Sequence, residues 1–181
     1  MVLLFLLIFV IIIFLLVILK TKRENFSNTK KKLAFCFMIY DKINNEELWY
    51  NFFKNIDKSK KNIYIHYKTN KPLKYFEQYK IKNTVETKWC GDSLVEAQNI
   101  ILKEAVNDSN NKHFIFVSDS CVPLKSFKYI YDKLDQRYSY FNKAIPYTKE
   151  FNKNIKAYKA SQWCILNKNH TKKILDNHAK L

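Results

Sequence analysis

The first 19 residues, Met1 to Leu19, contain no polar side chain. As an α-helix this run would span roughly 30 Å, close to the hydrocarbon thickness of a bilayer. A cleaved signal peptide would have a basic start and a small-residue cleavage site, and neither is present. A buried core helix of this length would usually be interrupted by a charge. We therefore expect residues 1–19 to form a single transmembrane anchor.

The segment after this run, residues 20–32, is polar, basic and without periodicity, which is typical of a stalk. The positive-inside rule would keep these basic residues, and the domain that follows them, in the cytosol. Three N-glycosylation sequons, at Asn25, Asn107 and Asn169, favour instead a glycoprotein that faces a lumen. The sequence leaves the topology open.

The chain has 32 Lys and Arg against 16 Asp and Glu, a formal net charge of +16. Such a charge suits an anionic partner: lipid headgroups, nucleic acid or a nucleotide diphosphate. We favour a compositional origin, because Lys, Asn, Ile, Tyr and Phe crowd a sequence with a single Gly, and many lysines then only cover a solvated surface. No nucleic-acid partner is expected. The four cysteines are scattered singly, which predicts no zinc site, and Cys36 and Cys164 lie in apolar runs typical of core thiols.

Short apolar runs alternate with amphipathic segments along residues 33–181, and this predicts an α/β sandwich with a largely parallel sheet. The runs are too short for helices and suit strands buried on both faces. The predicted strands are residues 33–40, 62–67, 113–118 and 162–166. The predicted helices begin at Asn44-Asn45, at Asp92-Ser93 with Ser93 and Glu96 as a capping box, at Ser126 and at Lys168.

In sheets of this kind, ligands bind beyond the carboxyl ends of the strands. That rule selects three loops, residues 40–43, 68–72 and 118–124. In the last loop, Asp119 could accept hydrogen bonds from ribose or sugar hydroxyls, and the serines beside it could donate to phosphate. The alternative is an ordinary turn whose Asp and Ser bond nearby backbone and whose bend is set by Pro123. Spacing alone favours the turn.

A second candidate is the segment Trp89-Cys90-Gly91-Asp92-Ser93, which holds the only glycine. Glycine is required where φ is positive or where another backbone or a ligand approaches closely. The free N–H groups at the start of the following helix suit a diphosphate. An ordinary junction between a loop and a helix explains the pattern equally well.

A third candidate is the segment Lys159-Ala160-Ser161-Gln162-Trp163, whose indole could stack on a sugar ring, although a Trp that enters a strand is more often core. His66, inside a predicted strand, is more often a satisfied strand residue than a base. There is no Asp-x-Asp motif, since the comparable position reads Ser118-Asp119-Ser120. A divalent metal ion is therefore not expected.

Taken in order, these blocks resemble the core-2/I-branching β-1,6-N-acetylglucosaminyltransferase family, closest to its plant-like and viral type. The resemblance is carried by KLAFCFMIYDKI, ELWYNFF, NIYIHYK, WCGDSLVEAQNIIL, FIFVSDSCVPL and KASQWCILNKNH, which begin at Lys32 and end at His170.

The resemblance implies a GT-A-type fold and an inverting, metal-independent transfer of a sugar, GlcNAc by analogy, from a UDP donor to a glycan hydroxyl. It also implies a Golgi- or ER-type membrane, or a viral or host membrane, and no cofactor beyond the UDP-sugar. The donor-binding residues would be Met38, Ile39, Tyr40, His66, Lys68, Gly91, Ser93, Asp119, Ser120 and Cys121. The acceptor-binding residues would be Ser161, Gln162 and Trp163. Lys68 stands where some members have an acidic uridine contact, and Ala160 where the family usually has Gly.

The resemblance assigns no catalytic residue in this sequence. The family's base is a Glu after the Ser-Gln-Trp block, and the basic residues for the diphosphate lie further on, whereas this sequence reaches Leu181 before either. Two other hypotheses therefore stand beside the enzyme. One is a catalytically inactive remnant that binds sugar nucleotide or glycan, and the other is a basic, membrane-tethered binding domain.

Overall fold

The computed structural model describes residues 9, 11–15, 31–152 and 155–178. Residues 9 and 11–15 are helical, and the remainder of the predicted anchor, with the stalk up to residue 30, lies outside the described residues. None of the helices within the described ranges has the length and apolarity needed to span a bilayer. The chain divides into two units, Met1–Lys30 and Lys31–Leu181. The α/β domain is the second unit.

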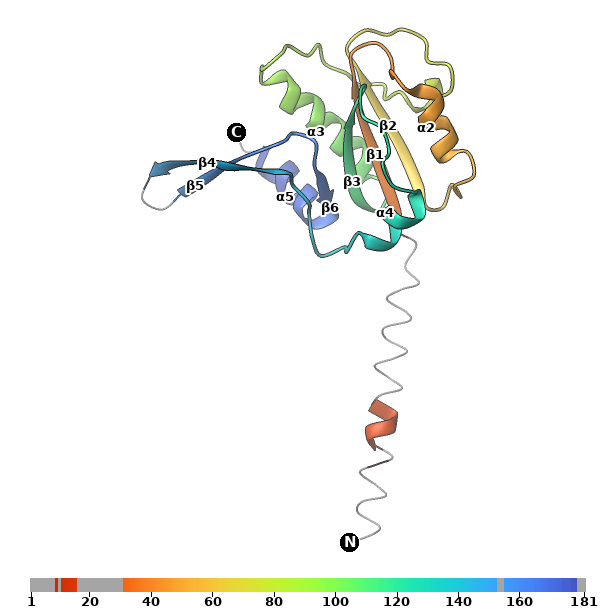
Figure 1. Ribbon diagram of the computed structural model, residues 1–181, viewed down its shortest axis with the longest axis vertical. Coiled ribbons are helices and arrows are strands. Elements are labelled where there is room, and N and C mark those ends of the chain that lie inside the picture. The colour runs from red at the N-terminus through yellow and green to blue at the C-terminus, as the bar shows by residue number, and fades with distance from the viewer. Residues whose placement is uncertain (1–8, 10, 16–30, 153–154, 179–181) are drawn as a thin grey trace. The chain divides into compact units, whose positions relative to one another are not determined.

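Four strands build the main sheet of this domain, in the order β2-β1-β3-β6 (Figure 1). They are β1 (Lys32–Ile39), β2 (Lys61–Tyr67), β3 (Asn111–Ser118) and β6 (Ile165–Asn167). The central strand β1 pairs in parallel with both β2 and β3, whereas β6 runs antiparallel to β3. The predicted largely parallel sheet is confirmed, and it fits a GT-A-type core.

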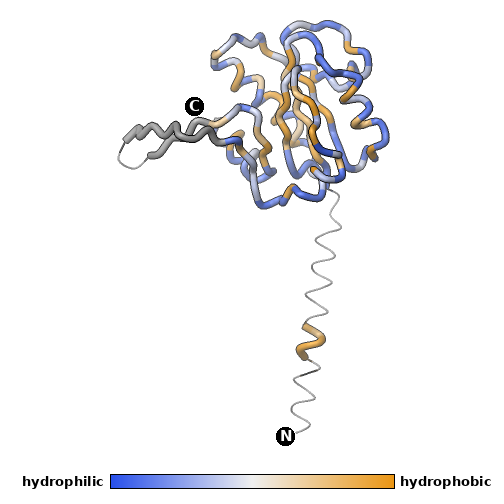
Figure 2. The backbone as a smooth tube through the Cα atoms, in the orientation of Figure 1, coloured by the Kyte–Doolittle hydropathy of each residue, from blue (hydrophilic) through white to orange (hydrophobic). Residues whose placement is uncertain are grey.

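Helices cover both faces of the sheet, so the domain has three layers. Alternate side chains of β1, from Leu33 to Ile39, pack with α2 (Glu46–Phe53) and with Phe127 of α4 (Phe127–Lys133). The intervening Ala34, Cys36 and Met38 pack with α3 (Ser93–Val106), and Leu175 of α5 (Lys168–His178) joins this second core. Because both faces of β1 are buried, its sequence is a continuous apolar run, visible as the orange centre of Figure 2.

Aromatic packing fixes α2 against the sheet and also reaches the loop after β3. Trp49 lies edge-to-face on Phe37, with ring centroids 5.0 Å apart, and Phe53 does the same on Phe35 at 4.8 Å. The indole Nε1 of Trp49 donates to the backbone oxygen of Cys121 at 2.9 Å. The hydrophobic layer thereby holds one of the loops that the sequence selects for ligand binding.

Three sequence-based expectations need correction. Ser93 is the first residue of α3 rather than its cap, and Asp92 before it makes no capping bond, so the capping box is wrong. The last strand, β6, begins at Ile165 instead of residue 162, because Trp163 N–H bonds Ser161 Oγ in a turn. A hairpin of β4 (Lys143–Asn152) and β5 (Ile155–Ala160), and a 3-10 turn at Glu77–Tyr79, were not predicted.

Candidate functional site

Hydrogen bonds join the loops that follow β1, β2 and β3 at the carboxyl edge of the sheet. The backbone N–H of Lys68, just after β2, donates to the backbone oxygens of Ile39 and Tyr40 at 3.1 and 3.0 Å. On the other side of β1, Asn44 N–H donates to Asp119 O at 2.9 Å, and its Nδ2 donates to Ser120 Oγ at 3.1 Å. The three loops therefore form one connected border, as expected for the ligand-binding edge of a parallel sheet.

The first part of this border is formed by Tyr40 and Lys68. Tyr40 is exposed, and the ammonium of Lys68 lies over its ring, 5.2 Å from the centroid. Next to them, Lys71 Nζ and Asp41 Oδ2 form an ion pair at 2.6 Å. The hydrogen bond from Lys71 holds the pKa of Asp41 below its ordinary value. A planar ring, a cation and a carboxylate thus share this stretch of the edge.

Met38 and Ile39, predicted to contact the donor, have side chains buried in the two cores. Met38 packs on the α3 side and Ile39 on the α2 side of the sheet. A ligand at this edge could therefore meet only their backbone atoms.

The turn Ser118–Cys121 follows β3 and bonds mainly to itself. Ser118 N–H donates to Cys121 Sγ at 3.3 Å, and Cys121 N–H donates to Ser118 O at 3.3 Å. Ser120 Oγ donates to Asp119 Oδ1 at 2.8 Å. The thiol of Cys121 thus closes the turn. The Oδ1 atom of Asp119 is the carboxylate oxygen that accepts this internal bond.

The turn before α3 is also closed, but not by a glycine with positive φ. Gly91 N–H donates to Lys88 O at 3.1 Å, and Lys88 N–H donates to Ser93 Oγ at 2.8 Å. Cys90, with φ of 56°, is the residue that takes the left-handed conformation. A Cβ on Gly91 would lie 3.3 Å from Lys88 O, a tight contact that a small shift of the turn would have to relieve.

His66 is a structural residue of β2 and its pKa reflects burial. Its ring is 1% exposed, and its Nε2 accepts a hydrogen bond from Val85 N–H at 3.0 Å. Desolvation lowers the pKa of His66 to about 4, so the ring is neutral at physiological pH. His66 therefore pins the segment that leads from β2 to the turn before α3.

The predicted acceptor residues lie in the turn just before β6, beside α3. Trp163 packs partly buried against the second core, and Gln98 Nε2 of α3 donates to Gln162 O at 3.4 Å. Ser161 and Gln162 border a cavity of about 270 Å³ whose walls are mostly apolar and include Leu102 and Phe116. Asn99 also lines this cavity, and its buried Nδ2 has no hydrogen-bond partner.

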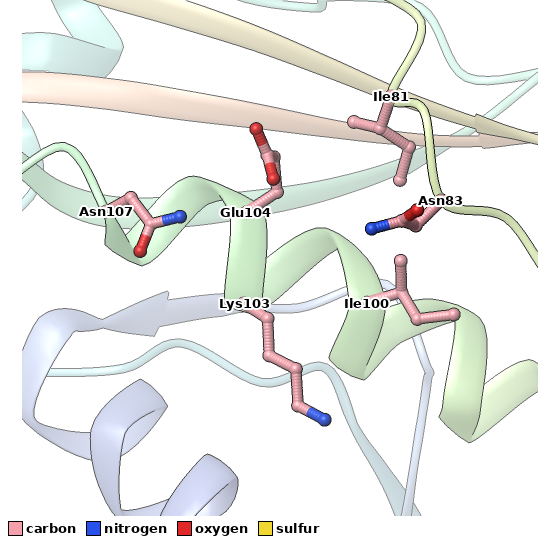
Figure 3. A pocket seen from close by; sticks show the side chains of 6 residues that line it. All are labelled: Ile81, Asn83, Ile100, Lys103, Glu104 and Asn107. Atoms are coloured by element: carbon pink, nitrogen blue, oxygen red, sulfur yellow. The ribbon is translucent and has the colours of Figure 1, made fainter.

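A second cavity, of about 330 Å³, lies between α3 and the segment after β2 (Figure 3). A third, of about 210 Å³, is bordered by Tyr50, Tyr75 and several lysines. None of these three cavities is lined by Lys68, Gly91 or Asp119. Within the described residues, no three His, Cys, Asp or Glu side chains gather as metal ligands would.

The structure therefore brings the predicted residues together in two groups. Tyr40 and Lys68 form one border with Asp119 and Ser120, through contacts of the loops after the strands. Gly91 and Ser93 form a separate turn, and across the described part of the chain no hydrogen bond links it to the Asp119 turn. The segment before the Gly91 turn is tied to the carboxyl end of β2, because Val85 N–H donates to the ring of His66, one residue before that strand ends.

Sequence reasoning missed two residues at this edge. The sequence predicts only a capping role for Asn44-Asn45, but Asn45 makes no side-chain capping bond at α2 and Asn44 bridges to Asp119 and Ser120. Trp89 was quoted as part of a motif and given no role, but its side chain is 93% exposed. A Trp in a polar loop, outside any apolar run, is the signal that could have identified it.

A profile of the core-2/I-branching enzyme family matches residues 33–143, which is more than half of the chain. The chain belongs to the core-2/I-branching enzyme family. All ten residues predicted to bind the donor lie within the matched range, whereas Ser161, Gln162 and Trp163 lie beyond it.

A rice protein, Glycosyltransferase BC10 of Oryza sativa subsp. japonica, is 28% identical to the chain over 166 residues. The alignment covers 83% of this chain and 42% of the rice protein. The core-2/I-branching domain described here thus spans less than half the length of that relative.

Proposed function

We propose that this chain is a membrane-anchored glycosyltransferase whose described domain binds a UDP-sugar donor. The transferred sugar would be GlcNAc, the acceptor a glycan hydroxyl, and the mechanism inverting and independent of a metal ion. Residues 1–19 would hold the protein in a Golgi- or ER-type membrane, or in a viral or host membrane. Membership of the family and the name of the rice relative support the transfer of a sugar.

One observation carries the proposal: the loops after the three parallel strands are bonded to one another at the carboxyl edge. This edge is where nucleotides bind in parallel α/β sheets. It offers chemically suitable groups, namely the exposed ring of Tyr40 with the ammonium of Lys68, and the carboxylate of Asp119. The start of α3 is less suited to a diphosphate than the sequence suggests, because the N–H groups of Leu94 and Val95 donate to the backbone oxygens of Gly91 and Asp92.

In this proposal each group has a separate task. Asp119 would accept hydrogen bonds from hydroxyls of the ribose or of the sugar. Its Oδ1 already accepts from Ser120 Oγ, so Oδ2 would be the oxygen that binds the ligand. Lys68 would meet the negative charge of the nucleotide. The residues from Ser161 to Trp163 would contact the acceptor. No residue of the chain is assigned as the base that takes the acceptor proton.

The test is calorimetric titration of the full chain in detergent with UDP and with UDP-GlcNAc, with and without a chelator. We expect binding that the chelator leaves unchanged. Asp119→Asn should weaken it about tenfold, because a hydrogen bond to a charged group contributes about 1.5–3 kcal/mol. The matched control is Asp132→Asn, whose carboxylate on α4 is paired with Lys128 at 2.6 Å. Absence of binding at millimolar nucleotide would refute the proposal, and binding without sugar transfer would identify an inactive binding protein.

A further inference from the structure

Trp89 has the highest exposed fraction, 93%, among the large hydrophobic side chains of the described residues. The other two tryptophans behave differently: Trp49 is 2% exposed, and Trp163 packs against the second core. Indole rings in proteins are usually largely buried, and exposed ones are concentrated at binding surfaces, where they contribute disproportionately to affinity. The exposure of Trp89 therefore calls for a partner.

The loop that carries Trp89 is held at both of its ends. Upstream, the buried His66 ring accepts the hydrogen bond of Val85 N–H. Downstream, Gly91 N–H donates to Lys88 O and Ser93 Oγ accepts from Lys88 N–H, so both residues bond back to the residue before the indole. The indole is thus presented on a closed turn, and little conformational freedom of the backbone would be lost when a partner binds.

The turn also keeps an unfavourable backbone conformation beside the indole. Cys90, the residue after Trp89, has φ of 56°, and it is the only residue other than glycine with positive φ in the described chain. Non-glycine residues seldom adopt this region. The hydrogen bond from Gly91 N–H to Lys88 O makes residues 88–91 a β-turn, and Trp89 and Cys90 occupy its two central positions.

The place of the turn in the fold points to the kind of partner. His66, one residue before the end of β2, holds Val85, so the turn that follows Val85 starts from the carboxyl edge of the sheet. The same edge carries the ring of Tyr40, the cation of Lys68 and the carboxylate of Asp119 in neighbouring loops. A pyranose ring has one face of C–H groups, which suits an indole, and a rim of hydroxyls, which suits polar neighbours. We propose that Trp89 is a stacking residue for a pyranose ring at this edge. The proposal rests on the proposed function and adds to it a recognition residue for the sugar itself.

The experiment measures binding to the full chain in detergent of three probes: UDP, UDP-GlcNAc and a free GlcNAc-terminated oligosaccharide. If the ring belongs to the donor, Trp89→Ala should weaken UDP-GlcNAc about tenfold and leave UDP unchanged. If it belongs to the acceptor, the same variant should weaken only the oligosaccharide. Trp89→Phe should retain part of the affinity in either case, because it keeps a planar ring.

The control variant is Tyr138→Ala, which removes a 54% exposed aromatic ring from the loop after α4. A second measurement is quenching of tryptophan fluorescence by acrylamide, in which the sugar ligand should protect a component that Trp89→Phe lacks. Unchanged affinity of Trp89→Ala for both sugar ligands would overturn the role of Trp89 while leaving UDP binding intact. Failure of the unmodified chain to bind any of the three probes would overturn the proposed function as well.

Discussion

At the scale of single residues, burial decides which polar side chains serve the fold and which are free for a ligand. His66 and His113 are both almost fully buried, and desolvation lowers the pKa of each. His66 accepts from Val85 N–H, and His113 Nε2 lies 3.1 Å from the backbone oxygen of Asp135, to which it donates. Asp119, by contrast, lies at the edge with a carboxylate oxygen available. The histidines therefore act in the fold as neutral hydrogen-bonding groups.

The low pKa of His66 predicts that the protein becomes less stable as the pH is lowered. The unfolded chain takes up a proton near pH 6.5 and the folded chain only near pH 4, so the stabilisation is complete above about pH 6.5 and decreases as the pH falls toward 4. From pH 7 to pH 5 this one group should lower the free energy of unfolding by about 2 kcal/mol.

The free energy of unfolding is measured with denaturant at pH 7 and pH 5, for the unmodified chain and for His66→Gln. The loss between the two pH values should be larger for the unmodified chain than for the variant. His170→Gln is the control, because His170 is exposed. An equal pH dependence in the unmodified chain and in His66→Gln would contradict the prediction.

At the scale of elements, two helix starts with similar sequence signals form different hydrogen bonds. Ser126 caps α4, its Oγ accepting from Tyr129 N–H at 3.2 Å, as a serine before a helix is expected to do. The start of α3 has an equally good local signal, but Ser93 Oγ is taken by Lys88 N–H. Ser93 therefore stabilises the turn before the helix, together with the bond from Gly91 N–H to Lys88 O, and does not form a capping box.

The two helix starts should therefore respond differently to substitution. Ser126→Ala removes a capping bond and should lower the free energy of unfolding by about 1 kcal/mol. Glu96→Ala should change it by less than about 0.5 kcal/mol, because Glu96 is not part of a capping box. Denaturant unfolding of both variants checks this, and a larger loss for Glu96→Ala than for Ser126→Ala would restore the capping box.

At the scale of the whole molecule, the domain and the apolar N-terminal run are separate units, Lys31–Leu181 and Met1–Lys30. The domain has two cores, one on each face of the sheet, and β1 contributes to both. The composition of residues 1–19 would make them costly to leave in water. Membrane attachment is therefore expected to depend on that run and not on the domain.

The proposed anchor can be tested by fractionation. The full chain should stay in the membrane pellet after an alkaline carbonate wash. Replacing Ile12 and Val17 by Lys places two charges in the apolar run, each costing about 2.5–3.5 kcal/mol at the centre of a membrane helix, and should release the protein. The matched control replaces the same residues by Leu. Retention of the Lys variant in the pellet would contradict the anchor.

Much of the domain's architecture could be predicted from local patterns. The run LAFCFMI is apolar at every position because both faces of β1 are covered, and it lies within β1 as expected, whereas Tyr40 after it is exposed. The last helix begins at its predicted first residue, Lys168. The β4–β5 hairpin was missed because residues 143–160 mix charged and apolar side chains without a clear period of two. The strand before α5 was placed too early because QWCIL is apolar, although its first residues form a turn.

Side-chain hydrophobicity along the chain is enough to predict the α/β alternation, the central strands of the sheet and the loops at its carboxyl edge, because these depend on local order alone. Three further features come from the folded chain: Cys90 takes the positive φ beside Gly91, His66 holds Val85, and the indole of Trp89 faces solvent. The shape of the turn before α3 is set by hydrogen bonds of Lys88 to Gly91 and Ser93, and no hydrophobic pattern reports such bonds. The bond between His66 and Val85 joins positions 19 apart, so it depends on how the chain folds back on itself.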